Sequence, residues 1–580
     1  MIEAKVSPDR TTALLWCVLC ALLLWSISPI LDPVNVEGFS AAIVGLGERL
    51  FQGDLQRFDQ LHPFNVEFFA LSKFGAVLNV AVLTRWFGLD GVTAIKIVIW
   101  ASEIVLLAAT AVLVRRWSGA SRLTAAAAIL LVPGLLENSF FINDNVPAAA
   151  LAALALLCWS RTPTAAKALL GGALLGFAAL TRSDTILLAV AAPLIFFEQT
   201  KDARRCLGLL AAAAIGGALV WCGGLALFGA SVLDVLRVGR HAVALWARPQ
   251  NFQYQEVLIF IGVPGLLLAM TGVIEALTQK LFVRLAFLMA PVLAVAIVIG
   301  SSLWQSRQLL TLAPFFATLV AFGLDRIVGR SARQNETVLR ACVIALVAVA
   351  WLWPQKAALD EGPRALFGRL YSPWQWSDWQ KRARADVAVI DRLIAGAPGQ
   401  TRALVTDDWS IDRYVNQQAT AAGFTLASPQ QTEAACRTIA EIFSRGDRRI
   451  AHIRIHQPFL PETRLLDRAR FDSLALPCLD ALAPSQTVWL RSGMPSPQDA
   501  PASDKVTSSI LSRVEAFLRA DSPPLIATPL DQAGLQRLKA RYAEEEAEEK
   551  PKFAEARRGA RSVEAAMAAT RQIIPFPRPK

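Results

Sequence analysis

Long apolar runs alternate with short polar segments over residues 1–353, whereas residues 355–580 mix apolar and polar positions throughout. The first apolar run covers residues 12–31, about 20 residues, which is the length that a helix needs to cross the hydrocarbon core of a bilayer. This run is long for the core of a signal peptide, and no A-x-A cleavage site follows it. The pattern therefore predicts an uncleaved first membrane helix, followed by further membrane helices.

Lysine and arginine residues gather in short loops between the apolar runs, and this distribution predicts the orientation of the membrane helices. Loops rich in these residues are expected in the cytoplasm, and they lie at 115–122, 161–167, 198–205, 278–284 and 325–334. The loops that alternate with them are expected outside, and they lie at 137–147, 181–184, 228–256 and 301–308. With a cytoplasmic N-terminus, the alternation gives about 11 membrane helices, and the chain leaves the last of them on the outer side.

The first outer loop contains two apolar stretches that we do not interpret as membrane helices. Residues 64–91 are apolar enough to span the bilayer, but a span here would turn every later basic loop outward. We therefore expect a re-entrant or interfacial helix, with Glu67 and Lys73 facing water. Residues 39–50 place apolar side chains at helical spacing and charged ones beside them, which is typical of a helix lying in the plane of the interface.

The second part of the chain divides in two. Residues 355–492 combine helical stretches with three strand-like runs, at 402–406, 449–455 and 486–490, which predicts a small periplasmic α/β domain after the membrane domain of residues 1–354. Residues 493–580 are rich in proline, alanine and charge, and we expect them to be mostly disordered, with a helix or two at most. Cys436 and Cys478 could form a disulfide in the periplasm, but their spacing leaves this open.

The composition excludes several classes of protein. Hydrophobic residues make up 54% of the 580 positions, a share too high for a soluble enzyme of this length. The net charge of +11 could suggest a nucleic-acid partner, but the basic residues lie mostly in short loops between apolar runs, so no such partner is expected. The sequence has no P-loop, no G-x-S-x-G motif and no zinc-ligand spacing, and we predict neither a cofactor nor a metal.

Several short motifs follow one another over about residues 10–330. They are Asp32 and Glu37, LFQGD at 50–54, HPF at 62–64, the loop and helix at 137–156, the glycine-containing helix at 171–184, and the helix at 306–324. Their order and spacing resemble the C-type (GT-C) glycosyltransferases, a class that includes the protein O-mannosyltransferases and the aminoarabinose transferase of lipid A. Two details depart from the usual pattern of this class: four residues separate the first-loop acids, which are usually adjacent, and Phe64 replaces the second proline of a His-Pro-Pro motif.

The resemblance implies a fold and a reaction. The fold is a GT-C-like, all-α polytopic membrane domain with interfacial helices in its first outer loop. The reaction moves a hexosyl or pentosyl group from a polyprenyl phosphate to a hydroxyl or amine acceptor on the outer face, with inversion. A first-loop carboxylate would accept the acceptor's proton. Glu37 is favoured over Asp32 because it lies nearer the interfacial helix, although either acid could simply solvate the loop, or Asp32 could cap a helix.

The resemblance also implies substrate-binding residues. Arg182 and Arg307 fall at the outer ends of expected spans, where either could hold the donor phosphate, could reach the interface, or, for Arg182, could pair with Asp184. Asp144 could bind the acceptor or orient the base, or could cap the helix that contains Pro147, a role that Asn143 or Asn145 could also fill. His62 and Lys73 are weaker candidates. His62 could hydrogen-bond the substrate, but a lone histidine is more often structural.

The expected partners are a polyprenyl-phosphate-linked sugar, membrane lipids, and an envelope glycan, lipid or protein acceptor. The expected location is the cell inner (plasma) membrane, with the C-terminal domain in the periplasm. A transporter or flippase for lipid-linked substrates would instead place ionisable residues at mid-membrane and show two related halves. A polysaccharide polymerase or ligase would carry a large late outer loop, for which residues 228–256 are a short candidate. A non-catalytic scaffold would depend on its C-terminal domain.

Overall fold

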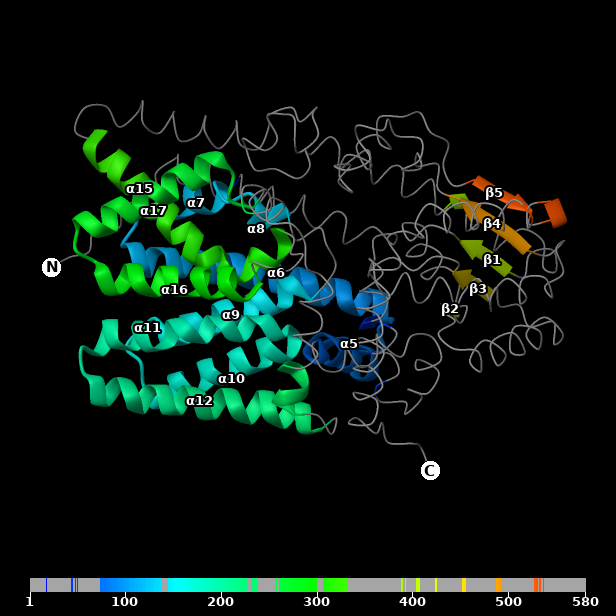
Figure 1. The fold of residues 1–580 in the computed structure, drawn as a ribbon, viewed down its shortest axis with the longest axis horizontal. Coiled ribbons are helices and arrows are strands. Elements are labelled where there is room, and N and C mark those ends of the chain that lie inside the picture. Colours follow the sequence, from blue (N-terminus) through cyan, green and yellow to red (C-terminus); the bar gives the residue numbers. More distant parts are fainter. Residues whose placement is uncertain are drawn as a thin grey trace, which may run out of the picture.

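The structure is a computed structural model, and it describes chiefly residues 73–137, 144–227, 231–236, 260–299 and 306–331, together with five short strands between residues 403 and 529. The helices form one body and the strands another, as Figure 1 shows. Asp32, Glu37 and His62 lie outside the described residues, as do Cys436 and Cys478. The predictions for these residues are therefore not tested by the fold.

The described part of the chain before residue 332 is helical. Three of its helical segments are long and apolar enough to cross a membrane, namely Gly91–Ser118, Ala203–Ala226 and Arg307–Ile327. The predicted membrane domain is confirmed at this level, whereas the expected number of about 11 spans stays a prediction. The elements are α5 Phe74–Phe87, α6 Gly91–Ser118, α7 Arg122–Leu130, α8 Gly134–Glu137, α9 Asn145–Trp159, α10 Ala165–Thr181, η2 Ser183–Val190, α11 Ala191–Thr200, α12 Ala203–Ala226, α15 Val263–Thr278, α16 Phe282–Ile299, η3 Ser306–Leu312 and α17 Ala313–Ser331.

The helix α6 begins and ends where its sequence supplies capping groups. The Asp90 side chain accepts a hydrogen bond from the backbone N–H of Thr93 at 2.9 Å, which satisfies one of the free donors of the first turn. Gly119 ends the helix in the left-handed conformation, at φ 76°, which glycine adopts without strain. Arg115 and Arg116 occupy the last turn, where positive charge complements the helix dipole. The local sequence thus determines where α6 ends and where the basic loop after it begins.

The described residues of the five basic loops lie at one end of the helical body. Side-chain contacts connect these loops or the residues next to them, although they are far apart in the sequence, and these contacts join Arg116 to Ser160, Arg284 to Glu198 and to the carbonyl of Trp117, Arg326 to Glu275, and Thr124 to Asp325. The gathering of the basic loops on one side is therefore confirmed in the described part of the chain. The side of the membrane on which this end lies stays a prediction.

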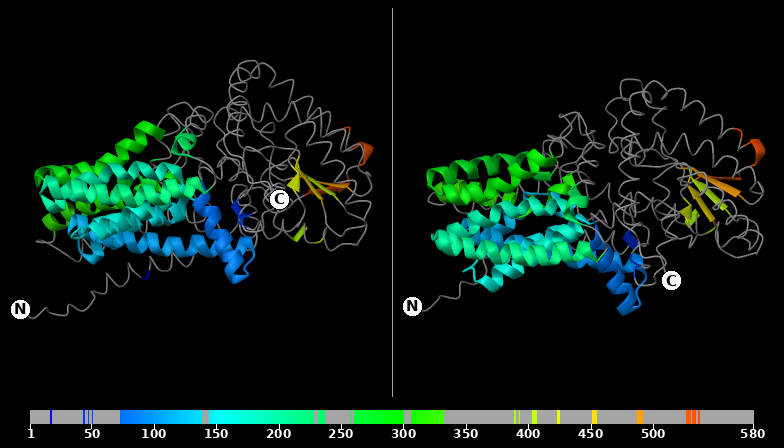
Figure 2. Two further views of the ribbon diagram at one scale, coloured as in Figure 1. Left: turned by 90° about the horizontal axis from the view of Figure 1, so that it is seen from below. Right: turned by 60° about the horizontal axis from the view of Figure 1, so that its bottom comes forward.

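Helices α10 and α12 pack with their backbones in close contact (Figures 1 and 2). A Cβ atom on Gly172 would lie 1.9 Å from the carbonyl oxygen of Ala213, and one on Gly216 would lie 2.1 Å from that of Leu169. Such distances leave room only for hydrogen, and small residues at helix interfaces are a common means of association in membranes. The glycines at the start of the 171–184 motif are thus packing residues that fix the direction of α10.

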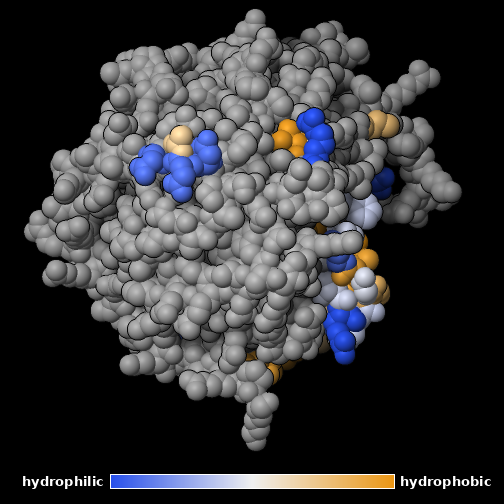
Figure 3. Space-filling model, turned by 90° about the vertical axis from the view of Figure 1, so that its right-hand side faces the viewer, coloured by the Kyte–Doolittle hydropathy of each residue, from blue (hydrophilic) through white to orange (hydrophobic). Residues whose placement is uncertain are grey.

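Helix α5 is short and is buried only over its first half. Its 14 residues extend about 21 Å, which is less than the roughly 30 Å of a bilayer's hydrocarbon core. All buried residues of α5 lie between Phe74 and Ala81, whereas Trp86 and Phe87 are 72% and 69% exposed next to Arg85. Figure 3 shows hydrophobic and hydrophilic side chains of described residues beside one another on the face it presents. Exposed aromatic and basic residues together favour the interfacial position expected for this helix.

Helix α6 carries a stripe of buried polar residues. Lys96, Glu103 and Thr110 recur at every seventh position, and all three are less than a tenth exposed. Neither oxygen of the carboxyl group of Glu103 has a hydrogen-bond partner in the described structure. Lys96 lies about 10.5 Å away along the helix axis, too far for a direct pair.

Replacement of Glu103 by leucine is expected to raise the melting temperature of the purified protein by a few degrees. A buried polar group without a partner costs about 1–3 kcal/mol, and leucine removes the polar atoms at similar volume. Glu103→Gln is the matched control and should melt near the wild type, because it keeps an unpartnered polar group. A lower melting temperature for Glu103→Leu than for Glu103→Gln would show that the carboxyl group is satisfied in the membrane.

Five strands form one sheet in the order β2-β3-β1-β4-β5. The first four strands along the chain are parallel where they pair, with Ala403 of β1 between Ala451 of β3 and Thr487 of β4, and β5 is antiparallel to β4. The parallel part of the sheet is typical of α/β domains. The strands are β1 Ala403–Thr406, β2 Gly423–Phe424, β3 Ala451–Arg454, β4 Thr487–Arg491 and β5 Ile526–Pro529.

Three of these strands confirm predicted ones, and the other two do not come from any predicted run. Strands β1, β3 and β4 fall within the apolar runs at 402–406, 449–455 and 486–490 or extend them by one residue. The expectation for residues 493–580 is corrected at one place, because β5 lies in this segment and pairs with β4. The helices that would make this an α/β domain lie outside the described residues, so the domain itself stays a prediction.

Candidate functional site

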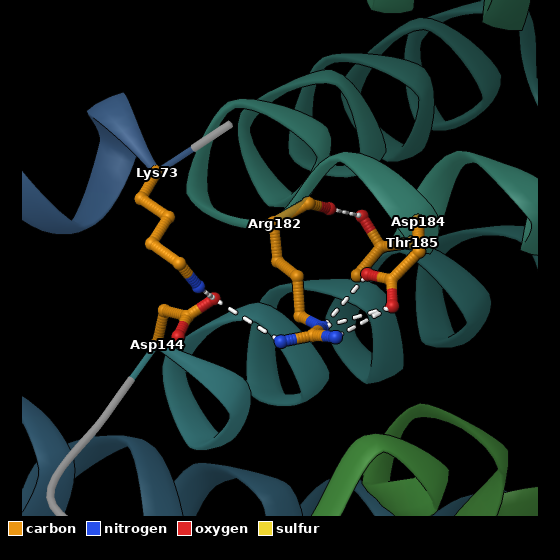
Figure 4. A network of polar contacts seen from close by, with 5 residues as sticks. All are labelled: Lys73, Asp144, Arg182, Asp184 and Thr185. Carbon is orange, nitrogen blue, oxygen red and sulfur yellow. Dashed lines mark hydrogen bonds and ion pairs between the residues drawn. The ribbon is translucent and has the colours of Figure 1, made fainter. Parts of the chain in front are cut away.

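A buried polar cluster lies where three helices begin or end. Lys73 immediately precedes α5, Asp144 immediately precedes α9, and Arg182 immediately follows α10. Asp184 and Thr185 follow in η2. Figure 4 shows the side chains of Lys73 and Arg182 pointing toward Asp144 from opposite sides, with the guanidinium group of Arg182 between Asp144 and Asp184. The cluster thus joins residues from three separate parts of the sequence.

Both cations contact the same oxygen atom of Asp144. The Nζ atom of Lys73 donates to Oδ2 of Asp144 at 2.5 Å, and Nη1 of Arg182 lies 3.4 Å from that oxygen. The other side of the guanidinium group is held more tightly, because its Nε and Nη2 donate to Oδ2 of Asp184 at 3.0 Å and 2.8 Å, and Nε also lies 2.8 Å from Oδ1. Asp184 therefore anchors Arg182, and Asp144 is the point at which the two cations converge.

Local sequence explains how these residues reach one place. The backbone of Arg182 is extended, at φ −158° and ψ 110°, so the chain changes direction between α10 and η2. Thr185 stabilises this turn by donating its hydroxyl to the carbonyl oxygen of Arg182 at 2.8 Å. A Cβ atom on Gly75 would lie 2.3 Å from the hydroxyl oxygen of Thr181, so only glycine lets α5 start against the end of α10. This contact brings Lys73 close to Arg182.

Burial makes the electrostatics of the cluster strong. The side chains of Lys73, Asp144 and Arg182 are 10%, 3% and 14% exposed. Burial alone would raise the pKa of Asp144, but the charges of Lys73 and Arg182 outweigh it and hold the pKa of this carboxyl group below its usual value. Asp144 is therefore an anion at neutral pH. Burial lowers the pKa of Lys73, Asp144 opposes this change, and the nearby charge of Arg182 adds to it.

The structure brings together three of the residues predicted to bind substrate, namely Lys73, Asp144 and Arg182. Arg307 lies half-buried in η3, which contacts α8 and α9. The alternative in which Arg182 pairs with Asp184 is confirmed, with Asp144 as a further partner.

Two expectations about the cluster are wrong. Lys73 does not face water, because it is only 8% exposed and is paired with Asp144. Asp144 precedes α9, yet its side chain makes no capping hydrogen bond, since it is committed to the two cations. The anchoring contact of Gly75 with Thr181 was not predicted, and its only signal in the sequence is a glycine near a helix start. In the described part of the chain, no three His, Cys, Asp or Glu side chains come close enough to hold a metal ion.

Comparison with known proteins gives matches among solved structures. No protein-family model matches the chain, and no curated protein matches it. The chain is similar to ArnT from Cupriavidus metallidurans bound to undecaprenyl phosphate, at 14% identity over 75% of this chain and 89% of that one, with a TM-score of 0.48. It is also similar to the oligosaccharyltransferase of Archaeoglobus fulgidus, at 11% identity over 83% of this chain and 69% of that one, with a TM-score of 0.41.

A further solved structure of the archaeal enzyme, AglB, contains an inhibitory peptide and a dolichol-phosphate, and matches at 11% identity over 74% of this chain and 68% of that one, with a TM-score of 0.37. ArnT and AglB are both GT-C glycosyltransferases, the class that the sequence motifs resemble. At this identity and TM-score the likeness carries no argument about the family or the individual residues of this chain. Their roles rest on the contacts of this chain alone.

Proposed function

We propose that the protein is an integral membrane glycosyltransferase that moves a sugar from a polyprenyl-phosphate donor to a hydroxyl or amine acceptor on the outer face of the membrane. The donor belongs to the class of lipid phosphates that includes the undecaprenyl phosphate in the ArnT structure. Glu37, or else Asp32, is the general base in this proposal. The proposed setting is a cell inner membrane, with the sheet-containing domain in the periplasm, where it takes part in acceptor recognition.

The observation that carries the proposal is the buried cluster of Lys73, Arg182 and their carboxylates at the end of the bundle opposite the basic loops. Helix α9 has Asp144 at its start, and at its other end the carbonyl of Trp159 accepts a hydrogen bond from Gln199, which lies in a basic loop. Buried cations at the end of a membrane domain are costly unless they have a task or partners. If the basic loops are cytoplasmic, these cations face the outer leaflet, where a lipid phosphate resides.

The proposed sugar transfer needs a carboxylate beside the acceptor and positive charge beside the departing phosphate. The acceptor's oxygen or nitrogen attacks the anomeric carbon, the bond between that carbon and the phosphate oxygen breaks, and the acceptor's proton passes to the carboxylate. One displacement inverts the anomeric centre. Polyprenyl phosphate leaves with increased negative charge, which a fixed guanidinium and an ammonium group stabilise. In this proposal Arg182 is held in orientation by Asp184, and Lys73 supplies the second positive charge.

A transporter or flippase for lipid-linked substrates is the second candidate, and one observation favours it. Lys96 and Glu103 are buried ionisable residues inside α6, and such residues often line transport pathways in membrane proteins. Sugar transfer by the detergent-solubilised protein, without a second compartment, would decide between the two functions. Such transfer is expected from the enzyme and not from a transporter.

The test of the proposed function is the binding of undecaprenyl phosphate to the purified protein in detergent. Lys73→Met is expected to weaken binding about 10- to 100-fold, because a hydrogen bond to a charged group contributes about 1.5–3 kcal/mol. Lys201→Met is the matched control: Lys201 pairs with Glu198 in a basic loop and its side chain is 63% exposed. Equal affinities for wild type, Lys73→Met and Lys201→Met, in folded samples, would contradict the proposal.

A further inference from the structure

The four charged side chains of the cluster balance one another. Lys73 and Arg182 contribute two positive charges, and Asp144 and Asp184 contribute two negative ones. A phosphate group that approached these four side chains would meet no net attraction. To bind phosphate with the strength of a charged pair, the cluster must release one cation from a carboxylate. The contacts indicate which carboxylate gives way.

Asp184 accepts two hydrogen bonds from Arg182 at Oδ2, from Nε at 3.0 Å and from Nη2 at 2.8 Å, and it lies two residues further along the chain. Asp144 holds the cations through Oδ2 alone, and its contact with Nη1 of Arg182 is long, at 3.4 Å. Two short charge-assisted hydrogen bonds hold a guanidinium group more firmly than one long contact does. Asp184 is therefore the permanent partner of Arg182, and Asp144 is the partner that can be replaced.

The position of Asp144 Oδ2 suits a phosphate oxygen. It lies where an ammonium and a guanidinium group converge, and it is buried. It also lies at the start of α9, a helix of 15 residues, where the helix dipole favours a negative charge. Because the side chain of Asp144 makes no capping hydrogen bond to its own helix, its displacement would not uncap α9.

We infer that Asp144 is a built-in competitor of the donor phosphate, a carboxylate that occupies the phosphate position in the empty site and yields Lys73 when the lipid phosphate binds. This inference rests on the proposed function and specifies how the same site releases its product. Asp144 returns to Lys73 when polyprenyl phosphate leaves, and so it keeps the affinity for the product low. It is a positioning residue and transfers no proton.

The test compares wild type with Asp144→Asn for binding of undecaprenyl phosphate by titration calorimetry in detergent. The amide cannot compete as an anion, so Asp144→Asn is expected to bind undecaprenyl phosphate about tenfold more tightly and to be inhibited by it at lower concentration. Asp90→Asn is the matched control, because Asp90 is an exposed carboxylate that caps α6 and asparagine caps equally well. Inorganic phosphate in parallel titrations separates recognition of the headgroup alone from recognition of the whole lipid.

The outcomes separate the inference from the proposed function. Wild-type binding with equal or weaker binding by Asp144→Asn would overturn the inference and leave the proposed function standing, whereas the absence of wild-type binding would overturn both. A change in Asp90→Asn equal to that in Asp144→Asn would also overturn the inference, because it would show a general charge effect. If Asp144→Asn does not fold, the comparison is made in protein that also carries Lys73→Met, so that removal of the carboxylate does not leave the lysine without its partner. Lys73→Met/Asp144→Asn should then bind more tightly than Lys73→Met, because Nη1 of Arg182 is released.

Discussion

Replacement of Arg182 by alanine is expected to abolish sugar transfer and to destabilise the protein. Arg182 is the link between two carboxylates, and its side chain is only 14% exposed. Without it, Asp184 loses both of its contacts and Asp144 keeps Lys73 alone. Breaking a buried ion pair by removing one partner costs about 3–5 kcal/mol. The loss of a fixed positive group at the departing phosphate is expected to slow transfer about 10²- to 10³-fold.

The measurement is complementation of a deletion strain, followed by mass spectrometry of its envelope glycans and glycoproteins. A sugar that is missing in the deletion strain should return with the wild type and not with Arg182→Ala. Arg182→Lys is the informative companion, because it keeps the charge but lacks the planar group whose two nitrogen atoms donate to Oδ2 of Asp184. Arg116→Ala is the control, since Arg116 binds Ser160 at the opposite end of the bundle. A full return of the sugar with Arg182→Ala would contradict the proposed role.

Glu37→Gln is expected to stop transfer while leaving the binding of undecaprenyl phosphate unchanged. A general base acts on the acceptor in the transition state, and its removal typically slows a reaction about 10²- to 10⁴-fold. The product lipid phosphate has no proton to give to this carboxylate, so its affinity should not depend on Glu37. This separation between rate and binding distinguishes a base from a residue that supports the phosphate site.

Asp32→Asn is the matched variant for this experiment. Both carboxylates follow the first predicted span, and both substitutions remove one charge from the same loop. Loss of transfer in Asp32→Asn alone would move the role of base to Asp32. Full transfer by both variants, in membranes that contain equal amounts of protein, would exclude a base in the first loop.

The sequence predicted those parts of the fold that depend on local pattern. The alternation of apolar runs and basic loops was sufficient to predict that the five basic loops share one end, which contacts such as that of Arg284 with Glu198 confirm. Strands β1, β3 and β4 fall within the predicted runs at 402–406, 449–455 and 486–490 or extend them by one residue, because each run shows a strand-like apolar pattern in the sequence. Strand β2 has two residues and β5 ends at Pro529, so neither shows a strand pattern without its neighbour.

The candidate site was only partly predictable because its contacts are long-range. Lys73 and Asp144 are separated by 71 residues, and no local pattern connects them. The distribution of basic residues predicted that Lys73 faces water, because this prediction considers only the position of a residue in a loop and not the partner of its side chain. Arg182 and Asp184 are two residues apart, and this pairing was considered from the sequence. Glu103 is a second example, because no local sequence pattern indicates that its buried carboxyl group has no hydrogen-bond partner in the described structure.

The contact between Gly75 and Thr181 has a consequence for the evolution of such sites. Neither residue belongs to the charged cluster, yet the absence of a Cβ atom on Gly75 lets α5 start against the end of α10 and so brings Lys73 close to Arg182. A methyl group added at this junction would push the two helix ends apart, and with them an ammonium group and a guanidinium group. The distances within the site are thus inherited through a steric constraint that no survey of charged residues detects.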